Sequence, residues 1–186
     1  MPSLTRLVSA KSLTTLEVSN YRHALEPSPA FCDAVAAASL VSLYFDAAEL
    51  FDALTAGLSL LSSVTGHPTL RHLSLRGNRV APAGRTAVGA ALGLLVAADS
   101  LLDALHISFC KLGNDGLLPF INALPRNTHL RRLTCEGNDF AQLAAARLLT
   151  AVRANASLIY LTAADLFVDP IPELVEAKAV VAARAT

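Results

Sequence analysis

The sequence predicts an α/β solenoid, in which a curved parallel sheet of short strands lines the inside and one helix follows each strand on the outside. Two observations predict it. Six segments open with the same pattern of apolar residues, 27 to 32 residues apart, and between these openings the apolar residues recur at helical spacing. The six opening residues are Leu13, Leu40, Leu70, Leu102, Leu130 and Leu158. A helix that joins two parallel strands needs a right-handed crossover, so about six stacked units form a right-handed solenoid.

The three central segments share apolar residues where a strand alternates, and then an Asn or Cys. They read Leu70, Leu73, Leu75, Asn78, Val80; Leu102, Leu105, Ile107, Cys110, Leu112; and Leu130, Leu133, Cys135, Asn138, Phe140. Alternate strand side chains enter the core, and we expect the Asn or Cys to face inward and bond backbone groups of the turn. These segments match the leucine-rich-repeat consensus.

The outer segments keep the strand pattern and lose the Asn. Ala48 stands at that position in the second segment, Leu166 in the sixth and Tyr21 in the first. The sixth continues to Val168. Terminal repeats are expected to be atypical, so this decay fits an array of repeats.

Helices are expected after each strand. The predicted ranges are Pro29–Ala38, Glu49–Val64, Ala83–Ala97, Asp115–Ala123, Ala141–Arg153 and a C-terminal capping helix at about 172–183. Residues 4–11 resemble the end of a helix from a preceding unit. The N-terminal edge is therefore expected to be open, which favours end-to-end association or contact with further parts of a longer protein.

Composition limits the class of protein. A length of 186 residues with 53% hydrophobic residues fits a single domain, 1–186. Equal numbers of basic and acidic residues give no charge pattern for nucleic acid or for an acidic membrane. The most apolar stretch, residues 87–98, is too short to span a bilayer, and the first residues lack the apolar core of a secretory signal. A cytoplasmic location is expected.

Three cysteines are present, and two of them occupy core positions of the repeats, Cys110 and Cys135. Buried reduced thiols are therefore expected rather than disulfides or metal ligands. The triplet Asn155-Ala156-Ser157 matches a glycosylation sequon, which occurs often by chance.

The segments that begin at Leu70 and Leu130, with Gly77-Asn78 and Gly137-Asn138, resemble leucine-rich repeats of the ribonuclease-inhibitor-like class. They are similar to repeats of NOD-like receptors, the ribonuclease inhibitor and Ran GTPase-activating proteins. The resemblance covers about residues 4–168. It implies a horseshoe arc that presents a concave sheet, and it is compatible with immune sensors, enzyme inhibitors, GTPase activators and cytoskeletal adaptors.

The repeat register predicts which side chains leave the strands on the concave face. Neighbouring strands lie about 4.8 Å apart, so these residues form a mixed polar surface with aromatic and guanidinium groups. The candidate partner-binding residues are Tyr44, Asp46, His72, Arg76, His106, Arg132, Glu136 and Tyr160.

Simpler interpretations of the same residues stay open. An exposed sheet face needs polar side chains in any case, and Asp46 is expected to pair with Arg76 at the surface. His72 and His106 lack a third ligand for a zinc site, so no metal site and no cofactor are expected. A triad of His106 with Ser74 and Asp46 lacks a nucleophile elbow and an oxyanion hole, so no catalytic residue is assigned.

These patterns predict a non-enzymatic module that binds a protein partner on its concave face. One alternative is a GTPase activator of the Ran-activating type, because such proteins share this repeat. A second alternative is a structural component of a larger assembly, favoured by the neutral charge and the high hydrophobicity. The sequence does not identify the partner.

Overall fold

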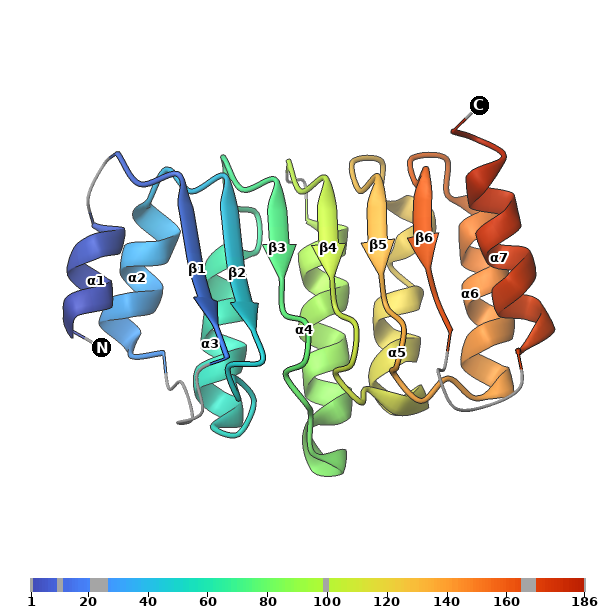
Figure 1. Ribbon diagram of the computed structural model, residues 1–186, viewed down its shortest axis with the longest axis horizontal. Helices are drawn as coiled ribbons and strands as arrows, with labels where there is room; N and C mark the ends of the chain where they lie inside the picture. Colours follow the sequence, from blue (N-terminus) through green and yellow to red (C-terminus); the bar gives the residue numbers. More distant parts are fainter. Residues whose placement is uncertain (1, 10–11, 21–26, 99–100, 165–169, 186) are drawn as a thin grey trace.

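The structure is a computed structural model that describes residues 2–9, 12–20, 27–98, 101–164 and 170–185. Six parallel strands form one sheet in the order β1-β2-β3-β4-β5-β6, and the helices form a second layer over one face of it (Figure 1). The strands are β1 (Thr15–Ser19), β2 (Ser42–Asp46), β3 (His72–Ser74), β4 (Ala104–His106), β5 (Arg132–Thr134) and β6 (Tyr160–Thr162). The predicted solenoid with a parallel sheet and outer helices is confirmed.

The α-helices run along the outer side of the sheet. They are α1 (Pro2–Val8), α2 (Pro29–Ala37), α3 (Leu54–Val64), α4 (Arg85–Ala97), α5 (Gly113–Ile121), α6 (Gln142–Ala154) and α7 (Pro172–Ala182), with short 3-10 turns η1 (Pro82–Gly84) and η2 (Leu124–Arg126). Helix α7 packs against α6 and β6 at the C-terminal end. Among these helices none is long and apolar enough to cross a membrane.

One predicted helix boundary is wrong by several residues. The sequence predicts a helix from Glu49, but α3 begins at Leu54. Glu49 adopts a left-handed backbone with φ +51°. The side chains of Leu50 and Phe51, in the turn that follows, are buried in the core. These apolar residues belong to the strand-to-helix turn, which periodicity alone cannot separate from the helix that follows. The positions of Tyr21, Leu166 and Val168 lie outside the described residues.

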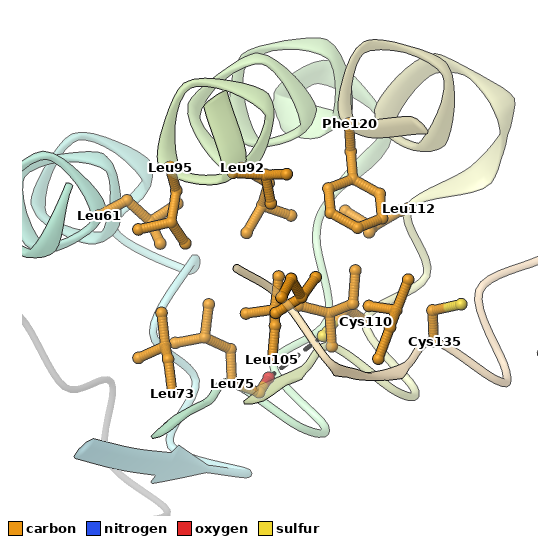
Figure 2. Packing of buried hydrophobic residues seen from close by; sticks show 14 of the residues in the cluster. Leu61, Leu73, Leu75, Leu92, Leu95, Leu105, Cys110, Leu112, Phe120 and Cys135 are labelled. Atoms are coloured by element: carbon orange, nitrogen blue, oxygen red, sulfur yellow. Dashed lines mark hydrogen bonds between the residues drawn. The ribbon is translucent and has the colours of Figure 1, made fainter. Parts of the chain in front are cut away.

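The core lies between the sheet and the helices. The strands contribute Leu43, Leu73, Leu105, Leu133 and Leu161, which occupy one row across the sheet and are all at most 7% exposed. Side chains of the helices, among them Leu92 and Phe120, meet this row from above (Figure 2). Burial of a leucine-sized side chain contributes about 1.5–3 kcal/mol, so the repeated leucines supply the main stabilising term.

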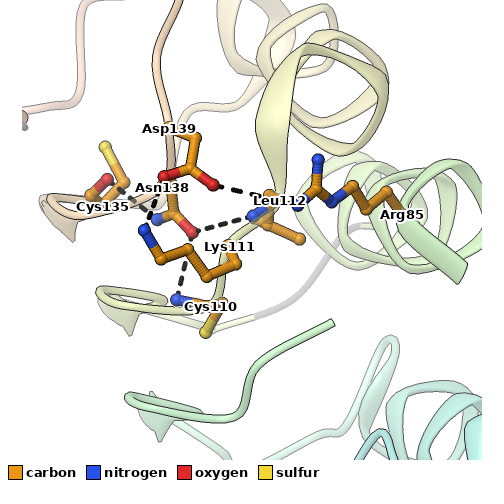
Figure 3. A network of polar contacts seen from close by, with 7 residues as sticks. All are labelled: Arg85, Cys110, Lys111, Leu112, Cys135, Asn138 and Asp139. Carbon is orange, nitrogen blue, oxygen red and sulfur yellow. Dashed lines mark hydrogen bonds and ion pairs between the residues drawn. The ribbon is translucent and has the colours of Figure 1, made fainter. Parts of the chain in front are cut away.

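The Asn position of the repeat holds each turn to its neighbour. Asn138 Nδ2 donates to the Cys135 carbonyl at 2.9 Å, while its Oδ1 accepts from the amides of Cys110 and Leu112 (Figure 3). Nδ2 also donates to the Ile107 carbonyl at 2.7 Å. Both ends of the buried amide are therefore satisfied by the backbone of two successive repeats, as the sequence predicts.

The other two central repeats fill the same position. Asn78 donates to the carbonyls of Phe45 and Leu75 and accepts from the amides of Ala48 and Leu50. In the fourth repeat the Cys110 thiol donates to the Leu75 carbonyl at 3.2 Å. Burial raises the pKa of this thiol to about 12, so it remains a neutral donor at physiological pH.

A second row of buried polar side chains, which the sequence analysis missed, lies at the opposite ends of the strands. Asn127 donates to the Val96 carbonyl at 2.8 Å and accepts from the Leu130 amide at 2.7 Å. Asn155 repeats these contacts one unit later, with the Leu124 carbonyl and the Leu158 amide. The His67 ring makes equivalent contacts: Nε2 bonds to the Val35 carbonyl, and Nδ1 accepts from the Leu70 amide. Each residue stands three positions before the first leucine of its repeat, which is the signal that could have revealed the row.

The sequon at Asn155 is explained by this row. The Asn155 side chain is 1% exposed and all of its polar atoms bond to backbone groups or to Ser157. The triplet is therefore a structural feature of the folded chain, because a buried and bonded amide is not accessible for glycosylation.

Glycines let two helices approach closely. A Cβ atom added at Gly89 of α4 would lie 2.1 Å from the carbonyl oxygen of Gly116 in α5. The two backbones therefore touch at this crossing, and no larger residue fits without moving one helix.

Replacement of Asn138 by Ala leaves four buried backbone groups without their partner. We expect the free energy of unfolding to fall by about 3 kcal/mol, since each unsatisfied buried polar group costs about 1–3 kcal/mol and part of the site can relax. Urea denaturation measures the change. Asn122→Ala, at an exposed position, is the matched control and should change stability by less than about 0.5 kcal/mol; equal losses in both variants would contradict the assigned role.

Replacement of Gly89 by Ala tests the close crossing of α4 and α5. Helix propensity alone would stabilise this variant by about 1 kcal/mol. The clash instead predicts a net loss of about 1–3 kcal/mol. Thermal unfolding decides between the two signs, with Leu94→Ala on the exposed side of α4 as a control that should stay near the wild-type value.

Candidate functional site

The concave face of the sheet carries the eight predicted side chains in columns. Strand pairing aligns Ser42, His72, Ala104, Arg132 and Tyr160 in one column. The next column contains Tyr44, Ser74, His106, Thr134 and Thr162. Asp46, Arg76 and Glu136 follow at or beyond the ends of the strands. Arg76, Arg132 and Tyr160 are exposed, whereas Tyr44, Asp46, His72, His106 and Glu136 are half-buried.

Asp46 does not form the surface ion pair expected with Arg76. Its Oδ1 accepts a hydrogen bond from Ser74 Oγ at 2.5 Å and another from the Arg76 backbone amide at 3.1 Å. The Arg76 guanidinium lies instead over the ring of Phe109, 5.3 Å from its centroid. Asp46 therefore fixes the backbone of the turn, and Arg76 is held by a cation–π contact worth about 0.5–1 kcal/mol at an exposed site.

Phe109 is a part of this surface that sequence reasoning missed. It has φ +61° at the turn position where the neighbouring repeats have Gly77 and Gly137, both with positive φ. A Cβ atom on Gly137 would lie 2.5 Å from the Phe109 ring, so the ring packs directly over that glycine. A phenylalanine where two flanking repeats have glycine is the sequence signal that could have identified it.

The two histidines are oriented by hydroxyl groups of adjacent strands. Ser42 Oγ lies 3.1 Å from His72 Nδ1, and Thr134 Oγ1 lies 3.0 Å from His106 Nδ1. Ser74, which a catalytic triad would need beside His106, donates to Asp46 instead. The residues of the hypothetical triad thus lie on one face but do not form the required chain of hydrogen bonds.

Charges on this face act on His106. Burial lowers its pKa from the ordinary value of 6.5; the nearby Asp46 carboxylate raises it, and the cationic forms of His72 and Arg132 lower it. The net shift is downward. His106 is therefore close enough to His72 and to Arg132 for their positive charges to act on it.

The outer side of the Asn138 turn carries an ion-pair network. Asp139 accepts from Lys111 Nζ at 2.7 Å and lies 3.8 Å from Arg85 Nη2 (Figure 3). The Asp139 side chain is 42% exposed, so these pairs contribute little to stability. They join three successive repeats on the side away from the concave columns.

Other features offer little for catalysis. In the part of the chain that the structure describes, no group of three or more His, Cys, Asp or Glu residues is placed to hold a metal ion. The thiols of Cys32, Cys110 and Cys135 are buried, and no disulfide joins them to one another. Burial is the main cause that raises the pKa of Cys32, followed by the Asp33 carboxylate, so this thiol is a poor nucleophile at neutral pH.

Comparison with known proteins agrees with this architecture. The family model described as Leucine Rich repeat matches residues 66–89 and 100–120. A solved structure of leiomodin-1 actin-binding site 2 is similar with a TM-score of 0.66 and 11% identity, over 98% of this chain and 88% of that one. The tropomodulin C-terminal domain of Caenorhabditis elegans has a TM-score of 0.60 and 11% identity, over 99% and 94% of the two chains. Comparison with curated proteins found no match.

The matched repeats, the sheet topology and these likenesses together show that the chain has the leucine-rich-repeat fold. At 11% identity the two solved structures establish the fold alone.

The downward pKa shift of His106 predicts how stability depends on pH. Because the folded-state pKa lies below the unfolded value, the unfolded chain takes up this proton first as the pH falls. The contribution of His106 to stability is therefore complete above its ordinary pKa of 6.5 and is lost as the pH falls below it. Urea unfolding of His106→Gln should show a smaller loss of stability between about pH 7.5 and about pH 5.5 than the wild type.

A control identifies the cause of the shift. Arg132→Gln removes a neighbouring positive charge and should raise the His106 titration midpoint in an NMR experiment, whereas Asp46→Asn should lower it further. A midpoint that both substitutions leave unchanged would show that these charges do not act on His106.

Proposed function

We propose that this leucine-rich-repeat protein is a non-enzymatic interaction module that binds a protein partner on its concave face. The observation that carries the proposal is the register of the sheet, which aligns His72, Arg132 and Tyr160 in one column and places Tyr44 in the next column of the same face. Aromatic and Arg side chains are the usual energetic centres of protein interfaces. Tyr160 is 51% exposed although it is large and aromatic, which supports an interaction surface on this strand.

The surface is ordered before a partner arrives. Hydrogen bonds hold Asp46, His72 and His106, and the Phe109 ring holds Arg76. Ordering a long side chain at an interface costs about 0.5–1.5 kcal/mol. A surface that is already held in place therefore loses less entropy when it binds.

We also propose a domain organisation, a repeat class, a location and a site of self-association. Residues 1–186 form one domain, supported by a continuous core from Val8 to Val181. The repeats belong to the ribonuclease-inhibitor-like class, supported by their length and their outer helices. A cytoplasmic location is supported by three buried cysteines that form no disulfide with one another. The edge strand β1, which pairs with β2 alone in the described sheet, is where end-to-end association would occur.

Actin is the first partner to test. The leiomodin-1 structure is that of actin-binding site 2, and its similarity covers nearly the whole of this chain. The GTPase-activator alternative rests on the repeat consensus, and no contact among the described residues favours it over a simple binding module.

Substitution of Arg76→Glu together with Tyr160→Ala should remove binding without unfolding the protein, because both side chains are exposed. Sedimentation with actin, and capture from a cell extract read by mass spectrometry, would measure it. We expect at least a tenfold loss of affinity, since interface centres of this kind contribute about 2 kcal/mol or more.

The matched control lies on the helical face. Arg147→Glu with Leu143→Ala makes the same change of charge and a similar loss of apolar surface on α6, where Leu143 is 52% exposed. If the control pair abolishes capture and the concave pair does not, the binding surface is helical and the proposal is wrong.

A further inference from the structure

Three basic side chains converge on the concave face around one small residue. Ala104 of β4 pairs with His72 of β3 on one side and with Arg132 of β5 on the other. His106 lies two residues after Ala104 and thus on the same face. Ala104 is only 2% exposed, because its small side chain lies between larger neighbours on the adjacent strands. We call His72, His106 and Arg132 the cationic trio.

The cationic trio has hydrogen-bond donors that are available to a ligand. In each histidine Nδ1 is engaged by a hydroxyl, Ser42 for His72 and Thr134 for His106, which leaves Nε2 of each ring as the remaining nitrogen. Arg132 is exposed, and its guanidinium forms no hydrogen bond or ion pair with any residue that the structure describes. Arginine carries five N–H donors suited to a carboxylate.

The surrounding charge is positive although the chain as a whole is neutral. Residues 70–76, 102–108 and 130–136 contain four Arg and two His against one Asp and one Glu. Asp46, the carboxylate that acts on His106, already accepts two hydrogen bonds from Ser74 and the Arg76 amide. Among the described residues no hydrogen bond or ion pair joins Asp46 to His72, His106 or Arg132, so the cationic trio has no directly bonded carboxylate there.

We propose that the cationic trio binds the carboxylate of an Asp or Glu side chain in an acidic segment of the protein partner. This inference rests on the proposed function and specifies the chemistry of the partner. A carboxylate has two oxygens and about four acceptor positions, enough for the guanidinium and both imidazoles. A carboxylate between the three groups also offsets their mutual repulsion.

Binding is therefore coupled to proton uptake. Affinity increases as the pH falls and the imidazoles become charged, because the charged rings attract the carboxylate more strongly. The other charged and titratable side chains on this face are Glu17 of β1, Tyr44 and Asp46 of β2, Arg76 after β3, Glu136 after β5 and Tyr160 of β6. Histidine is the side-chain type whose ordinary pKa lies nearest neutrality, so the two histidines account for the dependence.

Calorimetric titration of the full chain with a hexaglutamate peptide, at low salt and at about pH 6 and about pH 8, tests the proposal. We expect tighter binding at the lower pH, and a loss of about tenfold in Arg132→Gln, since this substitution removes the charged donors that pair with a carboxylate. His72→Gln with His106→Gln should abolish the pH dependence. Circular dichroism verifies that each variant is folded.

Arg131→Gln is the matched control, because Arg131 is also exposed and its loss changes the net charge equally. Equal weakening by Arg131→Gln and Arg132→Gln would show bulk attraction and overturn the site. Binding without pH dependence, or no binding of hexaglutamate, would overturn it as well. Inorganic phosphate that binds as tightly as the peptide would assign the site to a free anion instead of an acidic segment.

The two proposals fail separately. If Arg76→Glu with Tyr160→Ala abolishes partner capture while hexaglutamate does not bind, the concave interface stands and the carboxylate site is wrong. If hexaglutamate binds as expected while that pair leaves capture unchanged, the carboxylate site stands and the partner is held elsewhere.

Discussion

The backbone turn that leaves each strand is the constraint on which the rest of this structure depends. A parallel strand of three to five residues must be followed by a tight reversal whose amides and carbonyls are buried beneath the sheet. Asn78 and Asn138 satisfy these groups from both ends of one side-chain amide, and the Cys110 thiol takes over part of the task in the fourth repeat. An unsatisfied buried backbone group would cost about 1–3 kcal/mol in every repeat. The same turn therefore recurs, and with it the strand spacing and the position of the helix.

A second constraint acts at the opposite ends of the strands. His67, Asn127 and Asn155 bond a carbonyl of one repeat and the amides that begin a strand. Polar side chains thus hold the sheet at both ends of its strands, and leucine side chains pack between these two rows. Small residues such as Gly89 and Gly116 then allow adjacent helices to follow the strand spacing without separating.

These constraints produce a rigid concave face whose side chains come from different repeats. His72, His106 and Arg132 are 26 to 60 residues apart in sequence, yet neighbouring strands bring them to one surface. Rigidity of this kind suits recognition more than catalysis. The hydroxyl groups that orient the histidines belong to the sheet itself.

The sequence alone determined the repeat register, and from it the solenoid, the sheet order and the concave positions of Tyr44, His72, Arg132 and Tyr160, because apolar residues at fixed spacing can be buried in only one way. It could not determine the start of α3, since Leu50 and Phe51 look equally apolar in a turn or a helix. Only the tertiary structure placed the Arg76 guanidinium over Phe109. It also showed that Asp46 accepts hydrogen bonds from Ser74 and the Arg76 amide, and that the Asn155 side chain is buried and bonded to the backbone. These choices depend on distances between repeats, and such distances exist only after the strands have been stacked.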